Sequence, residues 1–320
     1  MKRAIYLAQS HDCAANLAGE AYLMGLDHDR ILYLWENDPC IVIGRYQNPW
    51  AECNLKRMEE DGVRLVRRQS GGGAVYHDRG NLIFTFIGDK ATATREQNFD
   101  LLLSALSSLG LECELSGRND ITLGGKKVSG NAFQNTATKF CHHGTLLVRG
   151  NLAVMGDYLT PSETKLSSKA VKSVASRVGN LAEGRGDITN GMVKDAIIAE
   201  FNRRYGPSEP IELDFTTVPE AAANYRRFGD YSQILAKSPP FTHEIHHRFE
   251  WGEANLRLRV EQSVIVDVQL YTDALDTTLS EEAATALIGT EYTKEALEHR
   301  ARAHGGTPLA ALFTLCGEQI

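Results

Sequence analysis

Three consecutive glycines, Gly71 to Gly73, constrain this chain most, because such a run weakens any regular helix or strand. Apolar segments at 63–66 and 82–87 predict strands before and after them, which places the glycines in a connecting loop. Two arginines precede the glycines and a His-Asp pair follows. Glycine allows a ligand to approach bare backbone N–H groups, and guanidinium groups suit phosphates and carboxylates. The loop therefore predicts an anion site, and the alternative is a glycine-rich hairpin with solvated arginines.

The two common nucleotide-binding fingerprints are both missing from the sequence. There is no Gly-x-x-x-x-Gly-Lys-Ser/Thr, and no Gly-x-Gly-x-x-Gly opens a helix. Any nucleotide is therefore expected to bind in another kind of fold.

Composition places the chain among ordinary globular proteins. With 320 residues, 42% of them hydrophobic and 23% charged, it has room for a large core and a second domain. A net charge of −7 argues against a nucleic-acid partner. The apolar run near the N-terminus is too short for a signal peptide, and no run reaches the ~20 residues of a membrane helix. We expect a cytoplasmic monomer whose six scattered cysteines are reduced and mostly buried.

Hydrophobic periodicity and turn residues predict the order of the elements in the first two thirds of the chain. Helices are expected at 12–26, 49–61, 98–109 and 190–205. Strands are expected at 31–35 (paired with 41–43), 63–66, 81–87, 116–123, 126–133 and 139–148, and a loop-rich stretch at 207–219.

The Gly124-Gly125 pair predicts a hairpin turn that is followed at once by two lysines. Neighbouring residues on a strand point to opposite faces, so Lys127 shares a face with Ser129 whereas Lys126 does not. Only one of the two lysines can therefore reach a given site. Two solvated lysines beside a turn are the alternative.

Two histidine patterns are judged not to bind metal. His142 and His143 are adjacent on a predicted strand, where they point to opposite faces and are expected to be structural. His243 and His247 fit the His-Glu-x-x-His pattern, which requires a helix to bring both imidazoles to one face. The residues that follow alternate as in a strand, so we treat this match as coincidental.

The remainder of the chain divides into a long irregular segment and a small α+β module. Residues 160–187 are poor in large apolar side chains and carry several cations, which suits either a loop that closes over an anion or a solvated loop. Pro239-Pro240 predicts a domain boundary. A three-stranded meander at 245–251, 255–260 and 263–271, then two or three helices within 280–316, are expected after it.

Taken together, the motifs make the chain resemble a bacterial lipoate–protein ligase. They occur in family order over residues 5–205, and the resemblance is weaker beyond them. They are Gly44-Arg45 with Gln47-Asn48-Pro49-Trp50, Arg67-Arg68-x-x-Gly71-Gly72-Gly73-Ala74-Val75-x-His77-Asp78, Gly117-Arg118-Asn119-Asp120, Lys127-Val128-Ser129-Gly130, His142-His143-Gly144-Thr145 and Ser173-Val174-x-Ser176-Arg177-Val178. The resemblance implies an α+β fold of the biotin/lipoate ligase kind. Residues 1–239 would form a catalytic domain of mixed sheets with surrounding helices, and 240–320 a small α+β accessory domain.

The same resemblance implies the reaction and the residues of the site. Lipoate would be activated by ATP, with Mg²⁺, to lipoyl-AMP, and the lipoyl group would pass to a lysine of a lipoyl domain. The acceptors would be the lipoyl domains of 2-oxoacid dehydrogenase complexes and the glycine cleavage H protein. Lys127 would be catalytic and Asp120 a Mg²⁺ or ribose contact, while strands 31–43 and 81–87 would line the lipoyl tunnel. Substrate-binding residues implied are Arg45, Arg68, Gly73, Ala74, Val75, Tyr76, His77, Asn119, Asp120, Lys127, Lys165, Ser173 and Arg177.

Three other functions are weighed against this one. An octanoyltransferase of the same superfamily would need a cysteine nucleophile, and Cys141 is the nearest candidate, since residues 160–187 contain no cysteine. A biotin–protein ligase would carry a different glycine motif. A catalytically silent lipoate-binding protein would not need Lys127.

Overall fold

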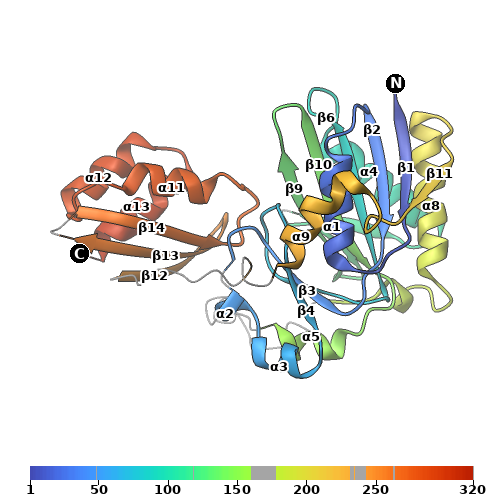
Figure 1. Cartoon of the computed structure of the whole chain (residues 1–320), viewed down its shortest axis with the longest axis horizontal. Helices are drawn as coiled ribbons and strands as arrows, with labels where there is room; N and C mark the ends of the chain where they lie inside the picture. The colour runs from blue at the N-terminus through green and yellow to red at the C-terminus, as the bar shows by residue number, and fades with distance from the viewer. Residues whose placement is uncertain are drawn as a thin grey trace.

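A computed structural model describes residues 1–47, 49–117, 119–159, 178–230, 234, 243–261 and 264–319. It is an α+β structure built on an eight-stranded mixed sheet in the order β11-β1-β2-β6-β10-β9-β8-β7 (Figure 1). These strands are β1 (Arg3–Ala8), β2 (Arg30–Trp35), β6 (Asn81–Asp89), β7 (Cys113–Ser116), β8 (Asp120–Leu123), β9 (Lys126–Asn135), β10 (Lys139–Leu147) and β11 (Pro210–Leu213).

Helices cover both faces of this sheet, because the strands are apolar on both sides. On β2, Leu32 and Leu34 pack with α4 (Arg95–Ser108) and α8 (Asn190–Tyr205), whereas Tyr33 and Trp35 pack with α1 (Cys13–Leu23) and α9 (Ala222–Gly229). The helix start predicted at Asp12 is found, whereas α4 begins at Arg95, earlier than the predicted 98. Asp12 caps α1 through its side chain, and α4 begins with a capping box of Thr94 and Gln97. The large sheet is therefore the buried centre of the main lobe.

A second, three-stranded sheet lies beside the first and corrects one prediction. Its order is β4-β3-β5, formed by β3 (Cys40–Ile43), β4 (Arg64–Arg67) and β5 (Val75–His77). The predicted pairing of 31–35 with 41–43 is wrong, because β2 pairs only with β1 and β6. The segment between them is no simple turn. Asn37 is fully buried there and its amide hydrogen-bonds Asn16 and His77, so the chain passes from one sheet to the other.

Two further predictions differ from the structure. The helix expected at 49–61 is divided into α2 (Pro49–Glu52) and α3 (Leu55–Glu60), because Asn54 caps a new helix by accepting from the Arg57 N–H. The stretch at 207–219 contains β11, which pairs in parallel with β1 although three of its four residues are exposed. The apolar side of the small sheet packs on α3 and on α5 (Leu152–Tyr158).

The C-terminal lobe matches the predicted module. It is an antiparallel meander of β12 (His243–Phe249), β13 (Gly252–Glu261) and β14 (Val264–Thr272). Three helices, α11 (Leu279–Leu287), α12 (Lys294–Ala303) and α13 (Pro308–Glu318), pack on one face of the meander (Figure 1). His243 and His247 lie on β12, which is a strand as predicted, and both are exposed. The predicted boundary at Pro239-Pro240 lies outside the described residues.

None of the helices within the described ranges combines the length and the apolar character that a membrane span requires.

Candidate functional site

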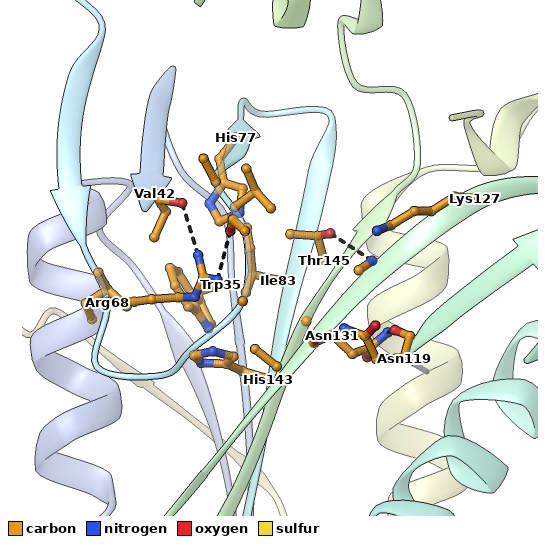
Figure 2. Close-up of a pocket in the computed structure, with 18 residues that line it drawn as sticks. Trp35, Val42, Arg68, His77, Ile83, Asn119, Lys127, Asn131, His143 and Thr145 are labelled. Carbon is orange, nitrogen blue, oxygen red and sulfur yellow. Dashed lines mark hydrogen bonds between the residues drawn. The ribbon is translucent and has the colours of Figure 1, made fainter. Parts of the chain in front are cut away.

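A pocket opens between the large sheet and the small sheet, and its empty space is about 660 Å³ when the part open to solvent is counted. Arg68 stands on one side of it and Lys127 on the other, with His143 between them (Figure 2). The lining consists of Leu17, Trp35, Val42, Arg68, Gly72, Gly73, Ala74, Val75, His77, Ile83, Asn119, Lys127, Gly130, Asn131, Ala132, His143, Gly144 and Thr145.

The three glycines of the loop meet three different requirements. A Cβ on Gly71 would lie 2.0 Å from the Ala274 carbonyl oxygen of the C-terminal lobe, so only glycine fits there. Gly72 has a φ of +93°, which side chains rarely adopt. Gly73 has no atom within 4 Å of where its Cβ would be, and it lines the pocket. A ligand can therefore approach the backbone directly at Gly73.

Arg68 holds this loop in place from inside the protein. Its Nη2 donates to the carbonyls of Gly71 (2.7 Å) and Gly73 (2.9 Å), and its Nη1 donates to the carbonyl of Val42 (3.0 Å). Its Nε donates to Ser70 Oγ at 3.0 Å. Burial lowers the pKa of Arg68 to about 10, so the guanidinium remains charged at neutral pH. It lines the pocket, and it also fixes the shape of the glycine loop.

One end of the pocket is apolar. Leu17 of α1, Trp35 of β2, Val42 of β3 and Ile83 of β6 form its wall, and all four side chains are buried. The two strand segments predicted to line a tunnel, 31–43 and 81–87, thus supply three of these four residues. This end suits a hydrocarbon chain.

A buried acid and a histidine lie against the same wall. Glu20 accepts from Thr85 Oγ1 at 2.8 Å and lies 2.7 Å from His143 Nδ1, while His143 Nε2 lies 2.6 Å from Ser70 Oγ. Burial favours the neutral acid, but His143, Thr85 and Arg68 outweigh it and hold the pKa of Glu20 below its ordinary value. Because Arg68 also donates to Ser70, the chain of contacts joins α1 to the glycine loop.

The two lysines of the hairpin separate as predicted. Lys127 lines the pocket and forms a 2.8 Å ion pair with Asp120, whereas Lys126 pairs with Glu183 at 2.7 Å away from the pocket. The hairpin turn has positive φ at both Gly124 and Gly125. Gly179 donates its N–H to the carbonyl of Lys127 at 2.9 Å, so the backbone at Gly179 lies directly beside this lysine.

His77 is a neutral member of the pocket wall. Burial, reinforced by the nearby charge of Arg68, lowers its pKa to about 3. Asn37 Nδ2 donates to His77 Nδ1 at 2.9 Å, which leaves the proton of the neutral ring on Nε2. His77 therefore contributes a fixed dipole and no charge.

The structure brings together most of the predicted site residues and separates others. Those that line the pocket are Arg68, Gly73, Ala74, Val75, His77, Asn119 and Lys127. The ring of Tyr76 stacks on Tyr158 instead, and Asp120 reaches the site through Lys127. Arg45 lies outside the pocket because its guanidinium pairs with Glu281 at 2.9 Å. Lys165, Ser173 and Arg177 lie outside the described residues.

The cysteines are free, as expected, and five of the six are buried. Burial raises the pKa of the Cys141 thiol well above its ordinary value, so almost no thiolate forms at neutral pH. Cys141 therefore lacks the properties of a catalytic nucleophile.

Sequence reasoning missed Glu20, Ser70 and Asn131. A carboxylate on the apolar side of the helix at 12–26 is the signal that points to Glu20, since an acid is rarely buried without a partner. Ser70 and Asn131 give no comparable signal, because small polar residues occur in most loops and strands.

Comparisons with known proteins show the family to which the chain belongs. Residues 12–202 match the family model of the lipoyl protein ligase A/B catalytic domain, and residues 238–304 match that of the bacterial lipoate protein ligase C-terminus. A lipoate-protein ligase A of Psychrobacter cryohalolentis is 43% identical, and the match covers 87% of this chain and 86% of that protein.

Solved structures show the same fold. LipL1 of P. falciparum, in complex with lipoate, superposes with a TM-score of 0.83 at 31% identity and covers 94% of each chain. A bi-partite ligase of Thermoplasma acidophilum shares the fold, with a TM-score of 0.63 at 23% identity over 76% of this chain and 99% of that one. A lipoate-protein ligase A bound with ATP also shares it, with a TM-score of 0.60 at 24% identity over 72% and 95% of the two chains.

Proposed function

Because this chain belongs to the lipoate–protein ligase family, we propose that its pocket holds lipoate and ATP side by side for adenylate formation. The enzyme activates lipoate with ATP to lipoyl-AMP and transfers the lipoyl group to a lysine of a lipoyl domain. One observation carries the assignment to this pocket: an apolar wall and a glycine loop held by a buried arginine meet in the same cavity. An apolar acid and a phosphate are the two ligands that such a cavity suits.

The chemistry proceeds in two displacements. A carboxylate oxygen of lipoate attacks the α-phosphorus of ATP, and the bond to pyrophosphate breaks. The amine of the acceptor lysine then attacks the carbonyl carbon, and AMP leaves with the electrons of the C–O bond. The first step brings two anions together, so a fixed cation between them lowers the barrier.

We assign that cation to Lys127. Lys127 lines the pocket together with Gly130, and its ammonium lies near this glycine. Asp120 orients the ammonium through their 2.8 Å ion pair. The exposed backbone at Gly73, with Ala74 and Val75, is the proposed contact for the nucleotide phosphate.

Mg²⁺ is proposed to accompany ATP. Asp120 offers one carboxylate in this region, and one carboxylate together with phosphate oxygens is a set that Mg²⁺ commonly takes. When bound, the ion would neutralise phosphate charge. Asp120, whose Oδ1 pairs with Lys127, is the residue that would hold the ion.

The remaining assignments are proposals about the parts around the pocket. Residues 160–181, which contain Lys165, Ser173 and Arg177, are proposed to close over the adenylate and exclude water. We propose a catalytic domain at 1–239 and an accessory domain at 240–320. The proposed acceptors are the lipoyl domains of 2-oxoacid dehydrogenase complexes and the glycine cleavage H protein.

Lipoate-dependent exchange between ATP and labelled pyrophosphate, without any acceptor, tests the first step. Lys127→Ala is expected to reduce the exchange rate by about 10²–10³-fold, as the loss of one group that stabilises developing charge typically does. Lys126→Ala is the matched control, because it removes the adjacent lysine, which points to Glu183. Equal exchange by both variants, with normal folding, would remove Lys127 from its proposed role.

A further inference from the structure

His142 is buried on the face of the large sheet opposite His143 and belongs to no part of the chemistry described above. Its Nε2 lies 2.9 Å from Asn131 Oδ1. Phe84, Phe99 and Phe133 surround its ring, with centroid distances of 5.5, 4.8 and 4.6 Å. We propose that His142 is a positioning residue that fixes the side-chain amide of Asn131 and, through it, Asn119 in the wall of the pocket.

The orientation of each group follows from its partners. Asn131 Nδ2 lies 2.9 Å from the Asn119 carbonyl and 3.1 Å from Ser129 Oγ, so this atom is the donor and Oδ1 is the acceptor. Oδ1 faces His142, and therefore His142 Nε2 carries the proton. The other ring nitrogen, Nδ1, is then an acceptor, and it has no hydrogen-bond partner among the described residues.

The Nδ1 of His142, unpartnered among the described residues, lowers the stability of the folded protein, because a buried acceptor without a partner destabilises the folded state. A phenylalanine would remove this atom but would leave Asn131 Oδ1 without its donor. Gly144 adds a second constraint, because a Cβ there would lie 2.6 Å from Asn131 Oδ1 and 2.6 Å from Phe84. The strand β10 thus supplies both the donor to the amide and the space that the amide needs.

The hydrogen bond from His142 helps to fix two asparagines of the site, Asn131 and Asn119. Asn131 and Asn119 form a reciprocal pair, since Asn119 Nδ2 donates to the Asn131 carbonyl in return. Both line the pocket with Lys127, on the side away from the apolar wall of Trp35 and Ile83. Without the His142 donor, the amide of Asn131 is held only through Nδ2, so its contact with the Asn119 carbonyl is fixed less firmly. The inference rests on the proposed function, since it assigns this side of the pocket to the reacting carboxylate and phosphate.

The test compares three variants in the ATP–pyrophosphate exchange assay, together with Tm and lipoate binding in the absence of ATP. His142→Phe removes the destabilising Nδ1 but also the donor to Asn131 Oδ1, so it is expected to leave the Tm nearly unchanged, to leave lipoate binding unchanged, and to lower kcat/KM for ATP at least tenfold. His142→Gln retains an N–H donor and is expected to recover part of that loss. Phe99→Leu, the matched packing control, is expected to lower the Tm without changing kcat/KM.

Several results would overturn the inference. They are an unchanged kcat/KM in His142→Phe, an equal loss in Phe99→Leu, or no recovery in His142→Gln. If His142→Phe does not fold, the ¹⁵N NMR tautomer of His142 in the intact enzyme decides, and a proton on Nδ1 contradicts the network. Absence of exchange in the unmodified enzyme would instead refute the proposed function itself.

Discussion

At the scale of single residues, the site and its surroundings depend on Arg68, which stays charged, and on two histidines, His77 and His142, that stay neutral. Arg68 is buried, and its three guanidinium nitrogens donate to the glycine loop and its neighbours, so its charge is offset by oriented dipoles. His77 and His142 are buried where burial opposes their charging. A network of this kind ties the stability of the site to pH.

Stability should therefore fall in mild acid. The unfolded chain takes up a proton at each histidine near pH 6.5, whereas the folded protein holds His77 neutral down to pH 3, so stability is complete above pH 6.5 and declines below it. We expect a loss of about 2 kcal/mol for each such histidine between pH 7 and pH 5. Urea unfolding at the two pH values measures it, and a loss in His142→Phe as large as in the unmodified protein would contradict the assignment for His142.

At the scale of elements, the glycine loop shows how one short segment serves packing and binding at once. Gly71 is required by the approach of the C-terminal lobe, Gly72 by its backbone angle, and Gly73 by the open space of the pocket. The same substitution should therefore have different effects at neighbouring positions.

Gly73→Ala should impair binding without harming the fold. The added methyl meets no atom within 4 Å, and an alanine restricts the unfolded chain, so the free energy of unfolding should stay equal or rise by about 0.5 kcal/mol. The methyl occupies ligand space, so we expect KM for ATP to rise about tenfold. Gly156→Ala on α5, which also meets open space, is the control for stability. A Gly73→Ala enzyme with unchanged KM would show that no ligand approaches this backbone.

At the scale of the whole molecule, the C-terminal lobe rests on the glycine loop itself. The Gly72 N–H donates to the Ala274 carbonyl at 2.9 Å, and the Thr272 N–H donates to the Tyr46 carbonyl at 3.0 Å. Arg45 and Tyr46 both contact Glu281 at the exposed rim of this junction. Backbone contacts at the centre should matter more than the exposed ion pair, since such pairs contribute about 0–1 kcal/mol.

Gly71→Ala should separate the two lobes, because its Cβ cannot coexist with the Ala274 carbonyl. Small-angle scattering is expected to show a larger radius of gyration for this variant. Glu281→Gln, which removes only the exposed ion pair, should scatter like the unmodified protein. Scattering that is unchanged by Gly71→Ala would mean that the loop moves instead of the lobe.

Local rules predicted much of this molecule. The alternation of a strand separates Lys127 from Lys126, the same rule sends His142 and His143 to opposite faces, and the strand assignment of 243–249 removes the apparent zinc motif. In each case the direction of the side chains follows from the conformation of one strand, which a few consecutive residues determine.

Long-range partners were not predictable in the same way. β2 and β3 are neighbours in sequence and belong to different sheets, because the buried Asn37 finds its partners on α1 and β5. β11 reaches β1 across about 200 residues, and its exposed side chains give no sign of it. Glu20 acquires a role only when α1 is packed against β6 and β10.

The position of β11 determines when the protein can assemble during synthesis. β1, the first strand made, has β2 on one side and β11 on the other, so the large sheet remains incomplete until residue 213 has left the ribosome. The meander of the C-terminal lobe begins only at residue 243. Chains fold from the N-terminus as they emerge, and unpaired strand edges invite association. The sheet that carries the pocket is therefore completed while the glycine loop still lacks its covering lobe, and the nascent chain passes through a stage in which that loop is open.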